Sequence, residues 1–328
     1  MLSAGENWLC KTIKRKGATN MKKFTALILT LMMLVSAAAY AETVTDTLTQ
    51  NTEEVIIVDM SAPTFEVGDD SAEYEVEGAS GWNVVTAYVK IAAGDDVLFN
   101  GPVTITSDNL SVAEFTLAAI YEVGCGQEGL EAGFVTSIGD YVSGTDANGN
   151  YVYWGYSVNG KYVPHTCTDM KVLEGYYISW DFMTYNADAG FDTAAVLPCG
   201  YPAPFEVGED EAEYAVEGAS GWNVAKINMK ITAGEDVLFN GVVTLTSDSL
   251  TVAEATLGAV YEVGCGQEGL EAGFVTSIGD YVAGPDADGN YVYWANAVNG
   301  IYLPFACNEF RLLDDDYVQW DFVAYSAQ

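Results

Sequence analysis

Two short segments of the chain carry oxygen-bearing side chains at alternate positions around a glycine. Their members are Asp146, Asn148 and Asn150 in the first segment, and Asp286, Asp288 and Asn290 in the second. Short calcium loops present their ligands in this way. The full calcium loop is absent, however, because aromatic and apolar residues follow and no glutamate stands at the closing position. Since Asx-Gly turns between strands have the same pattern, the sequence favours a turn and keeps calcium as the alternative.

Aromatic residues gather in one predicted hairpin and suggest a surface on which a flat ligand could stack. In a strand, Tyr151 and Tyr153 share one face, while Trp154 and Tyr156 share the other. One face must belong to the core, and the other can be an exposed stacking platform. The candidate ligand-binding residues are Tyr153, Trp154, Tyr156, Tyr293 and Trp294. Core packing and the filling of an edge strand are the alternative interpretation of the same side chains.

The cysteine spacing predicts one disulfide bond in each half of the chain. Cys125 and Cys167 are 42 residues apart, and Cys265 and Cys307 have the same spacing. A secreted chain favours these pairings, and two reduced, buried thiols in each half are the alternative. Cys199 has no cysteine counterpart in the other half, so it either joins two chains into a disulfide-linked dimer or stays a free thiol.

No recognisable catalytic set is present. The single histidine, His165, corresponds to Phe305 in the second half, which excludes a shared His-based triad or a shared zinc site of histidine and cysteines. No serine or cysteine lies in a recognisable nucleophile motif. Acidic pairs are too frequent on so acidic a chain to indicate a glycosidase. We therefore expect a protein that is not an enzyme.

Most of these features occur twice because the chain contains an internal duplication. From Ala62 onward each position has a counterpart 140 positions later, and Tyr121–Val142 recurs letter for letter as Tyr261–Val282. A gapless repeat of this length indicates two tandem domains rather than the short units of a solenoid. We expect module 1 at 62–187, a linker at 188–202 and module 2 at 203–328.

The first 41 residues have the pattern of a secretory signal peptide. A basic start at Met21 precedes the apolar run 24–38 and the cleavage pattern at 39–41, and a linker is expected at 42–61. Met21 is therefore a candidate for the true start, and we expect a protein that is secreted or held noncovalently at the cell surface, without a membrane span. Beyond residue 41 the chain keeps 46 of its 47 acidic and 6 of its 12 basic residues, so it should repel nucleic acid.

Strand signals dominate each module. Residues 225–231 alternate between apolar and polar, which predicts a half-buried strand. Asn-Gly pairs between apolar runs predict tight hairpin turns at 100–101, 240–241 and 159–160, and a last strand is expected at 177–185.

One helix completes the expected module. Ser111 and Glu114 form a capping box, with Thr251 and Glu254 as the counterparts, and Gly124 is placed to end the helix. The predicted fold class is α+β: two tandem β-rich modules, each a mostly antiparallel sheet with one helix, in a β-grasp-like arrangement.

Four motifs, taken in order, resemble the C-terminal β-rich domain of transcobalamin and intrinsic factor, and the bacterial secreted domains of unknown function grouped with it. In module 2 they are 251–257, 273–279, 293–300 and 313–322, and module 1 carries the same marks. In the vitamin carriers this domain closes over one face of cobalamin. The resemblance therefore implies a non-enzymatic binding module for a small planar ligand such as a corrinoid. The alternative is a structural or adhesive cell-surface module, stabilised by calcium.

Overall fold

The computed structural model describes residues 13–15, 66–185, 203–287 and 289–325. The predicted signal peptide and linkers, with Cys199 and Asp288, lie outside the described residues except for the short strand β1 (Ile13–Arg15). Module 1 then contains β2 (Ala72–Val76), β3 (Val84–Ala93), β4 (Asp96–Thr106), α3 (Val112–Val123), β5 (Gln127–Glu128), η1 (Leu130–Ala132), β6 (Ser137–Ile138), β7 (Tyr141–Val142), β8 (Gly144–Thr145), β9 (Tyr151–Val158), β10 (Lys161–Tyr162) and β11 (Tyr177–Tyr185).

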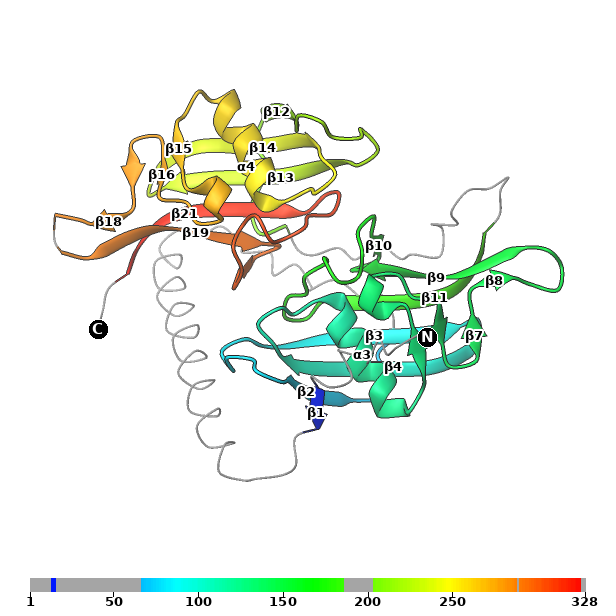
Figure 1. The fold of residues 1–328 in the computed structure, drawn as a ribbon. Coiled ribbons are helices and arrows are strands. Elements are labelled where there is room, and N and C mark those ends of the chain that lie inside the picture. Colours follow the sequence, from blue (N-terminus) through cyan, green and yellow to red (C-terminus); the bar gives the residue numbers. More distant parts are fainter. Residues whose placement is uncertain (1–12, 16–65, 186–202, 288, 326–328) are drawn as a thin grey trace, which may run out of the picture. The chain divides into compact units, whose positions relative to one another are not determined.

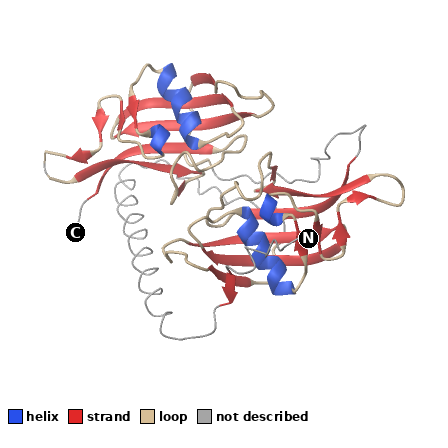
Figure 2. Ribbon diagram, viewed as in Figure 1, coloured by secondary structure: helices blue, strands red, loops and turns tan. Residues whose placement is uncertain are grey.

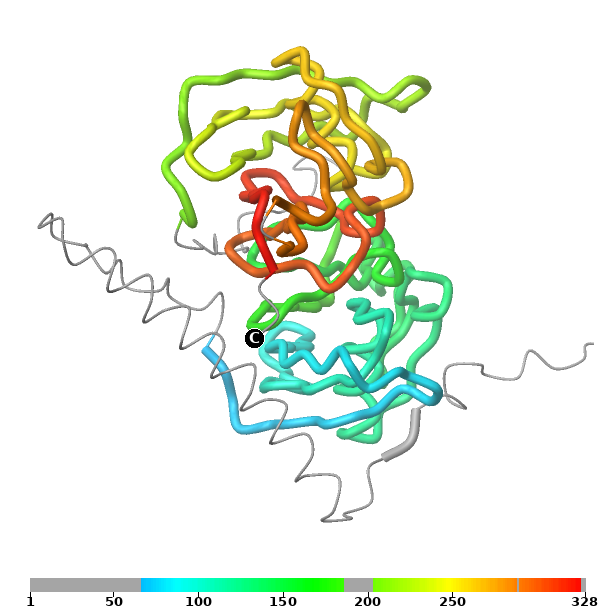
Figure 3. The backbone as a smooth tube through the Cα atoms, turned by 90° about the vertical axis from the view of Figure 1, so that its left-hand side faces the viewer, coloured from blue at the N-terminus to red at the C-terminus, as the bar shows by residue number. Residues whose placement is uncertain are grey.

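Module 2 repeats this order of elements (Figure 1), and its chain can be followed from green to red in Figure 3. Its elements are β12 (Asp210–Ala215), β13 (Val224–Ala233), β14 (Asp236–Thr246), α4 (Val252–Glu262), β15 (Gln267–Glu268), η3 (Leu270–Ala272), β16 (Ser277–Ile278), β17 (Tyr281–Val282), β18 (Gly284–Pro285), β19 (Tyr291–Val298), β20 (Ile301–Tyr302) and β21 (Tyr317–Tyr325). The tandem α+β architecture predicted from the repeat is therefore confirmed.

One main sheet forms the body of each module. In module 1 its strands run in the order β2-β4-β3-β11-β9-β10, and β8 also pairs with β9. The β3–β4, β9–β11 and β9–β10 pairs are antiparallel, whereas β2–β4 and β3–β11 are parallel. The sheet is thus mostly antiparallel, as expected, and the parallel β3–β11 pair at its centre requires the long connection that contains the helix.

The α-helix of each module, α3 or α4, covers one face of its sheet (Figure 2). The predicted capping box is present: Glu114 N donates to Ser111 Oγ, and Ser111 N donates to the Glu114 carboxylate at 3.0 Å. Gly124 then adopts φ +71°, in the left-handed region that glycine tolerates best, and ends α3. We call the sheet face that packs against the helix the inner face, and the opposite face the outer face.

The inner face carries the core. Along β3, Ala87, Val89 and Ile91 are completely buried, as the alternation of apolar and polar residues predicts. Trp180 in β11 is also buried, and its indole Nε1 donates to Thr116 Oγ1 of α3 at 2.8 Å. Trp320 and Thr256 repeat this contact in module 2 at 2.9 Å, so the same buried hydrogen bond ties the helix to the sheet in both copies.

Two of the three predicted Asn-Gly turns are wrong. Asn100 and Gly101 lie inside the continuous strand β4, and the turn between β3 and β4 falls at Gly94, which has φ +63°. The glycine is needed for another reason: a Cβ at Gly101 would lie 1.7 Å from the backbone oxygen of Asp70. Gly241 meets Asp210 in the same way at 1.7 Å in module 2. The third predicted turn, at Asn159 and Gly160, is confirmed, with φ of +51° and +75°.

In module 2 the chain crosses the outer face of the sheet before it enters the edge strand β12. Phe205 packs against Tyr317 of β21, with ring centroids 5.3 Å apart, and lies under Lys230 of β13. The backbone oxygen of Glu206 accepts a hydrogen bond from Asn240 Nδ2 of β14 at 3.2 Å, and the chain then enters β12. This crossing segment, residues 203–209, covers one end of the outer face.

Replacing Gly101 or Gly241 by alanine should destabilise the affected module by about 3 kcal/mol, because the new methyl group would overlap a backbone atom that side-chain movement cannot relieve. The measurement is the free energy of unfolding by denaturant. Gly126→Ala is the matched control, since nothing lies within 4 Å of its added Cβ. Equal stability of the Gly101 and Gly126 variants would contradict this close approach of the two chain segments.

Candidate functional site

The structure decides which face of the aromatic strand is core. Trp154 is 6 % exposed; its ring centroid lies 5.1 Å from that of Phe182, and its Nε1 donates to the backbone oxygen of Tyr141 at 3.0 Å. Tyr156 stacks on Trp180 at 4.8 Å and donates its hydroxyl proton to the His165 backbone oxygen at 2.7 Å. Burial raises the pKa of Tyr156, which keeps the phenol neutral. Trp154 and Tyr156 therefore belong to the inner face.

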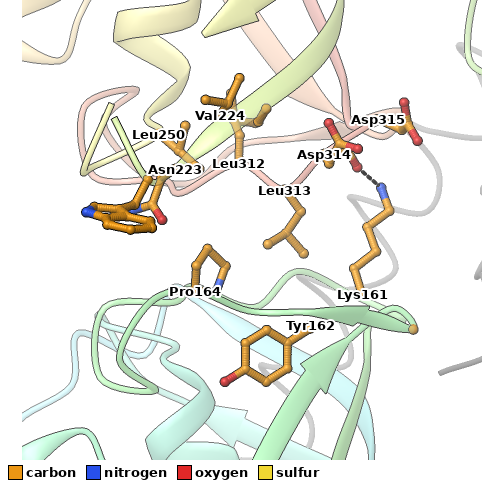
Figure 4. Close-up of a pocket in the computed structure, with 13 residues that line it drawn as sticks. Lys161, Tyr162, Pro164, Asn223, Val224, Leu250, Leu312, Leu313, Asp314 and Asp315 are labelled. Atoms are coloured by element: carbon orange, nitrogen blue, oxygen red, sulfur yellow. Dashed lines mark hydrogen bonds between the residues drawn. The ribbon is translucent and has the colours of Figure 1, made fainter. Parts of the chain in front are cut away.

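The other face of the same strand carries tyrosines at the surface. Tyr151 is 52 % exposed, and its ring lies nearly parallel to that of Tyr153, with centroids 6.4 Å apart. Strand pairing brings two more tyrosines to this face: Tyr185 lies opposite Tyr151, and Tyr162 lies opposite Ser157 (Tyr162 is labelled in Figure 4). Burial, and then the nearby phenols of Tyr162 and Tyr185, raise the pKa of Tyr153, so these three side chains form one cluster.

Module 2 repeats every member of this tyrosine cluster. We define the cluster as Tyr151, Tyr153, Tyr162 and Tyr185 in module 1, and as Tyr291, Tyr293, Tyr302 and Tyr325 in module 2. The four tyrosines of module 2 are between 38 % and 61 % exposed. The crossing segment covers the end of the outer face near Tyr317, and the opposite end carries Tyr291, Tyr293 and Tyr325. Tyr302 lies closer to the covered end, where it pairs with Ala297.

The sequence prediction of a ligand site therefore divides into two groups. Tyr153 and Tyr293 lie on the outer face, within the cluster. Trp154, Tyr156 and Trp294 are packed on the inner face, where their rings are not available to a ligand at the surface. Alternation along the strand separated these two groups correctly but could not say which one was buried. Tyr185 and its counterpart Tyr325 were missed, because only the pairing register between β9 and β11, or β19 and β21, brings them to this surface.

The loop of alternating oxygen side chains is held by its own hydrogen bonds. Asp146 Oδ1 accepts from the backbone nitrogens of Asn148 and Asn150, both at 2.8 Å, and these contacts hold the pKa of Asp146 below its usual value. Asp286 accepts from Asn290 N at 2.8 Å and from Asn290 Nδ2 at 3.0 Å. Within the described ranges no three His, Cys, Asp or Glu side chains are grouped to hold a metal ion. The geometry matches the Asx-turn interpretation.

The four cysteines of the two modules are free thiols in the structure, unlike the disulfides that their spacing predicts. Cys167 is buried beneath the η1 turn, with its Sγ 3.3 Å from the Gly133 backbone oxygen, and burial raises its pKa to about 12. Cys125 instead follows the end of α3 and is half-buried beside Gly139. The two thiols of a module therefore have separate surroundings, although their sequence spacing is the same in both copies.

An open cavity of about 570 Å³ surrounds the second half-buried thiol, Cys265. Its wall is formed by the start of β14, the end of α4 and the β16–β17 turn, and it includes Asp236, Asp280 and Tyr281. The Tyr281 hydroxyl donates to Asp236, which raises the pKa of Tyr281. All these residues have identical counterparts in module 1, as the repeat requires.

Part of module 1 matches a known family. Residues 111–184 match the family model described as Domain of unknown function (DUF4430). The match begins at the N-cap of α3 and ends within β11. It includes the aromatic hairpin and three members of the tyrosine cluster, and it ends one residue before the fourth, Tyr185. No curated protein matches the chain. None of the helices described here is long and apolar enough to cross a membrane.

The single histidine should make module 1 sensitive to mild acid. Burial lowers the pKa of His165 from 6.5 to about 4, and its Nε2 is buried without a hydrogen-bond partner in the described structure. Because the unfolded chain binds this proton more readily than the folded chain, His165 should reduce stability as the pH falls from about 6.5 towards 4. His165→Phe, which copies Phe305 of module 2, should weaken this pH dependence in denaturant unfolding curves. An unchanged pH profile would contradict the burial of a neutral imidazole.

Proposed function

We propose that this chain is a secreted, non-enzymatic binding protein whose two modules each hold a small planar ligand on the tyrosine cluster. The observation that carries the proposal is the presence of four tyrosines on the outer face of the sheet in both copies, three of them towards the same end of that face. Secretion rests on the signal-peptide pattern of residues 1–41. The absence of a recognisable catalytic motif in the sequence supports a binding role.

Tyrosines suit this task for physical reasons. A tyrosine ring offers a large flat contact with only two side-chain torsions to fix, so ordering it costs little conformational entropy. The stacked pair of Tyr151 and Tyr153 already presents two nearly parallel rings, with an interplanar angle of 18°. Phenol hydroxyls at the ring edges can donate hydrogen bonds to polar groups around the rim of a ligand. The acidic charge of the chain, −35 overall, favours neutral or cationic ligands over anionic ones.

A corrinoid is the ligand that we favour. It has a flat macrocycle with polar amide groups at its rim, which matches aromatic rings surrounded by hydroxyls. The resemblance of both modules to the C-terminal domain of transcobalamin and intrinsic factor, described from the sequence motifs, supports this choice. The matched family is a domain of unknown function, so ligand identity rests on the chemistry of the cluster and on that resemblance.

Titration of the full chain with aquocobalamin should show two sites per chain, one for each cluster, in visible absorbance and in tryptophan fluorescence. Tyr153→Ala and Tyr293→Ala should each weaken one site by about fivefold in Kd, because the loss of one ring contact is worth about 1 kcal/mol. The double variant should weaken both sites. No spectral change with the ligand in large excess would exclude the corrinoid proposal.

Tyr121 and Tyr261 provide the matched controls. They are 57 % and 59 % exposed, like the cluster, but they lie on the helices α3 and α4 rather than on the outer face. Tyr121→Ala and Tyr261→Ala should leave both sites unchanged. A loss of affinity in these variants equal to that of the cluster variants would mean that the ligand does not use the outer face.

An adhesive surface module is the second candidate, and one observation favours it. Trp82 and Trp222 are 72 % and 90 % exposed at matching loops. Each loop is braced: Ser80 donates to Asp108 through its backbone nitrogen at 2.9 Å, and Ser220 and Asp248 repeat this contact. A fixed loop that keeps an indole in water is suited to contact with a partner. Stabilisation by calcium and pairing through Cys199 belong to this candidate. A melting temperature unaffected by a chelator would exclude stabilisation by calcium, and a monomer on non-reducing gels would exclude pairing through Cys199.

A further inference from the structure

The chain contains five Asn-Gly pairs, and this dipeptide is chemically reactive. They are Asn100-Gly101, Asn148-Gly149, Asn159-Gly160, Asn240-Gly241 and Asn299-Gly300. In such a pair the backbone nitrogen of the glycine can attack the side-chain carbonyl carbon of the asparagine, since no Cβ on the following residue blocks the approach. Whether it does so in a folded protein depends on whether the asparagine side chain and the glycine backbone can move.

The pairs that form the β9–β10 and β19–β20 turns are locked. Asn159 and Asn299 are only 3 % and 8 % exposed. The Asn159 Oδ1 accepts a hydrogen bond from Tyr177 N at 2.9 Å, and the Asn299 Oδ1 accepts one from Tyr317 N at 3.0 Å. The attack would require both side chains to leave these buried contacts, which means local unfolding of the hairpin.

The pairs inside β4 and β14 are locked by the strands. Asn100 N donates to Asp70 Oδ2 at 2.8 Å, and Asn100 Nδ2 donates to the Glu66 backbone oxygen at 2.9 Å. Asn240 repeats both contacts in module 2. The glycine that follows lies against the Asp70 or Asp210 carbonyl in a paired strand, so its nitrogen cannot turn towards the side chain without opening the sheet.

Asn148-Gly149 has a different environment. Both residues are exposed, in the turn between β8 and β9, and Gly149 has φ +86°. Asn148 is held through its backbone nitrogen to Asp146 Oδ1 at 2.8 Å, and its side-chain amide lies near the same carboxylate. The Gly149 N–H donates to the Asp146 backbone oxygen at 3.1 Å. This hydrogen bond and the contact of the Asn148 side chain with the Asp146 carboxylate have to open before attack, and both lie in an exposed turn outside the paired strands.

We propose that Asn148 is a site of spontaneous deamidation in the folded protein, and that the fold protects the other four Asn-Gly pairs. The Gly149 nitrogen loses its proton and forms a bond to Asn148 Cγ, the Cγ–Nδ2 bond breaks, and ammonia leaves. Water then opens the resulting succinimide at either carbonyl carbon, which gives aspartate or isoaspartate at this position. The reaction needs no enzyme, oxidant or metal, and it accelerates as the pH rises because the backbone nitrogen must be deprotonated.

The two products of the reaction would affect the loop in different ways. Aspartate at position 148 gives the loop the sequence that module 2 already has, where Asp288 precedes Gly289. Isoaspartate instead adds a methylene to the backbone, which would break the contacts that Asn148 N and Asn150 N make with Asp146. Because Thr145 pairs with Tyr151, this second product would loosen the part of the hairpin next to the tyrosine cluster of module 1.

Incubation of the full chain at mildly alkaline pH, followed by Asp-N digestion and tandem mass spectrometry, tests the proposal. In the native protein, deamidation at Asn148 should be at least about tenfold faster than at the other four pairs, because each of those must first open locally. In urea all five pairs should react at similar rates. Isoaspartyl methyltransferase should label the incubated native chain, and Asn148→Gln should remove this label.

The result that would overturn the proposal is native Asn148 reacting no faster than Asn159 and Asn299, or remaining intact while the unfolded chain reacts. Asn148→Asp provides a second control, because it carries the aspartate product without passing through ammonia loss. Its methyltransferase label at early times should stay well below that of the incubated wild type. These readouts are independent of ligand binding, so they do not depend on the proposed function.

Discussion

The buried hydrogen bond between tryptophan and threonine organises each module. Thr116 Oγ1 accepts from the Trp180 indole and donates to the Val112 backbone oxygen, and every atom involved is shielded from water. An indole N–H without a partner in a core would cost roughly 1–3 kcal/mol, so this contact fixes both the height of the helix over the sheet and the side of β11 that faces it. Thr256 and Trp320 make the same contact in module 2.

The choice of face in β11 has consequences across the sheet. Once Trp180 points inwards, antiparallel pairing places Tyr156 opposite it, and Tyr156 must also point inwards. Residues an odd number of positions away along the same strands then point outwards, among them Tyr153 and Tyr185. The tyrosine surface is therefore a result of how the core is packed. A change of one residue in strand register would exchange the surface for the core.

The fold could be predicted largely from local signals, and the site could not. The capping box at Ser111 and the turn at Asn159 are decided by a few adjacent residues, and both are where the sequence indicates. Asn100 and Gly101 form the same dipeptide, but there the glycine allows a close approach to Asp70. Asp70 is 30 residues before Asn100 in the chain, so no local pattern reveals this contact. The grouping of Tyr162 with Tyr153 depends likewise on strand pairing. Contacts between distant segments are the information that the sequence alone lacked.

The crossing segment gives module 2 an asymmetric outer face. Phe205 shields Tyr317 and Lys230, whereas the opposite end of the same face stays open at Tyr293 and Tyr325. The footprint available to any ligand therefore has a fixed border on one side, formed by the residues that lead into the module from the preceding linker. A ligand larger than the open end would have to displace Phe205, so the entry of the chain into the domain would also set an upper limit on the size of a ligand at the proposed site.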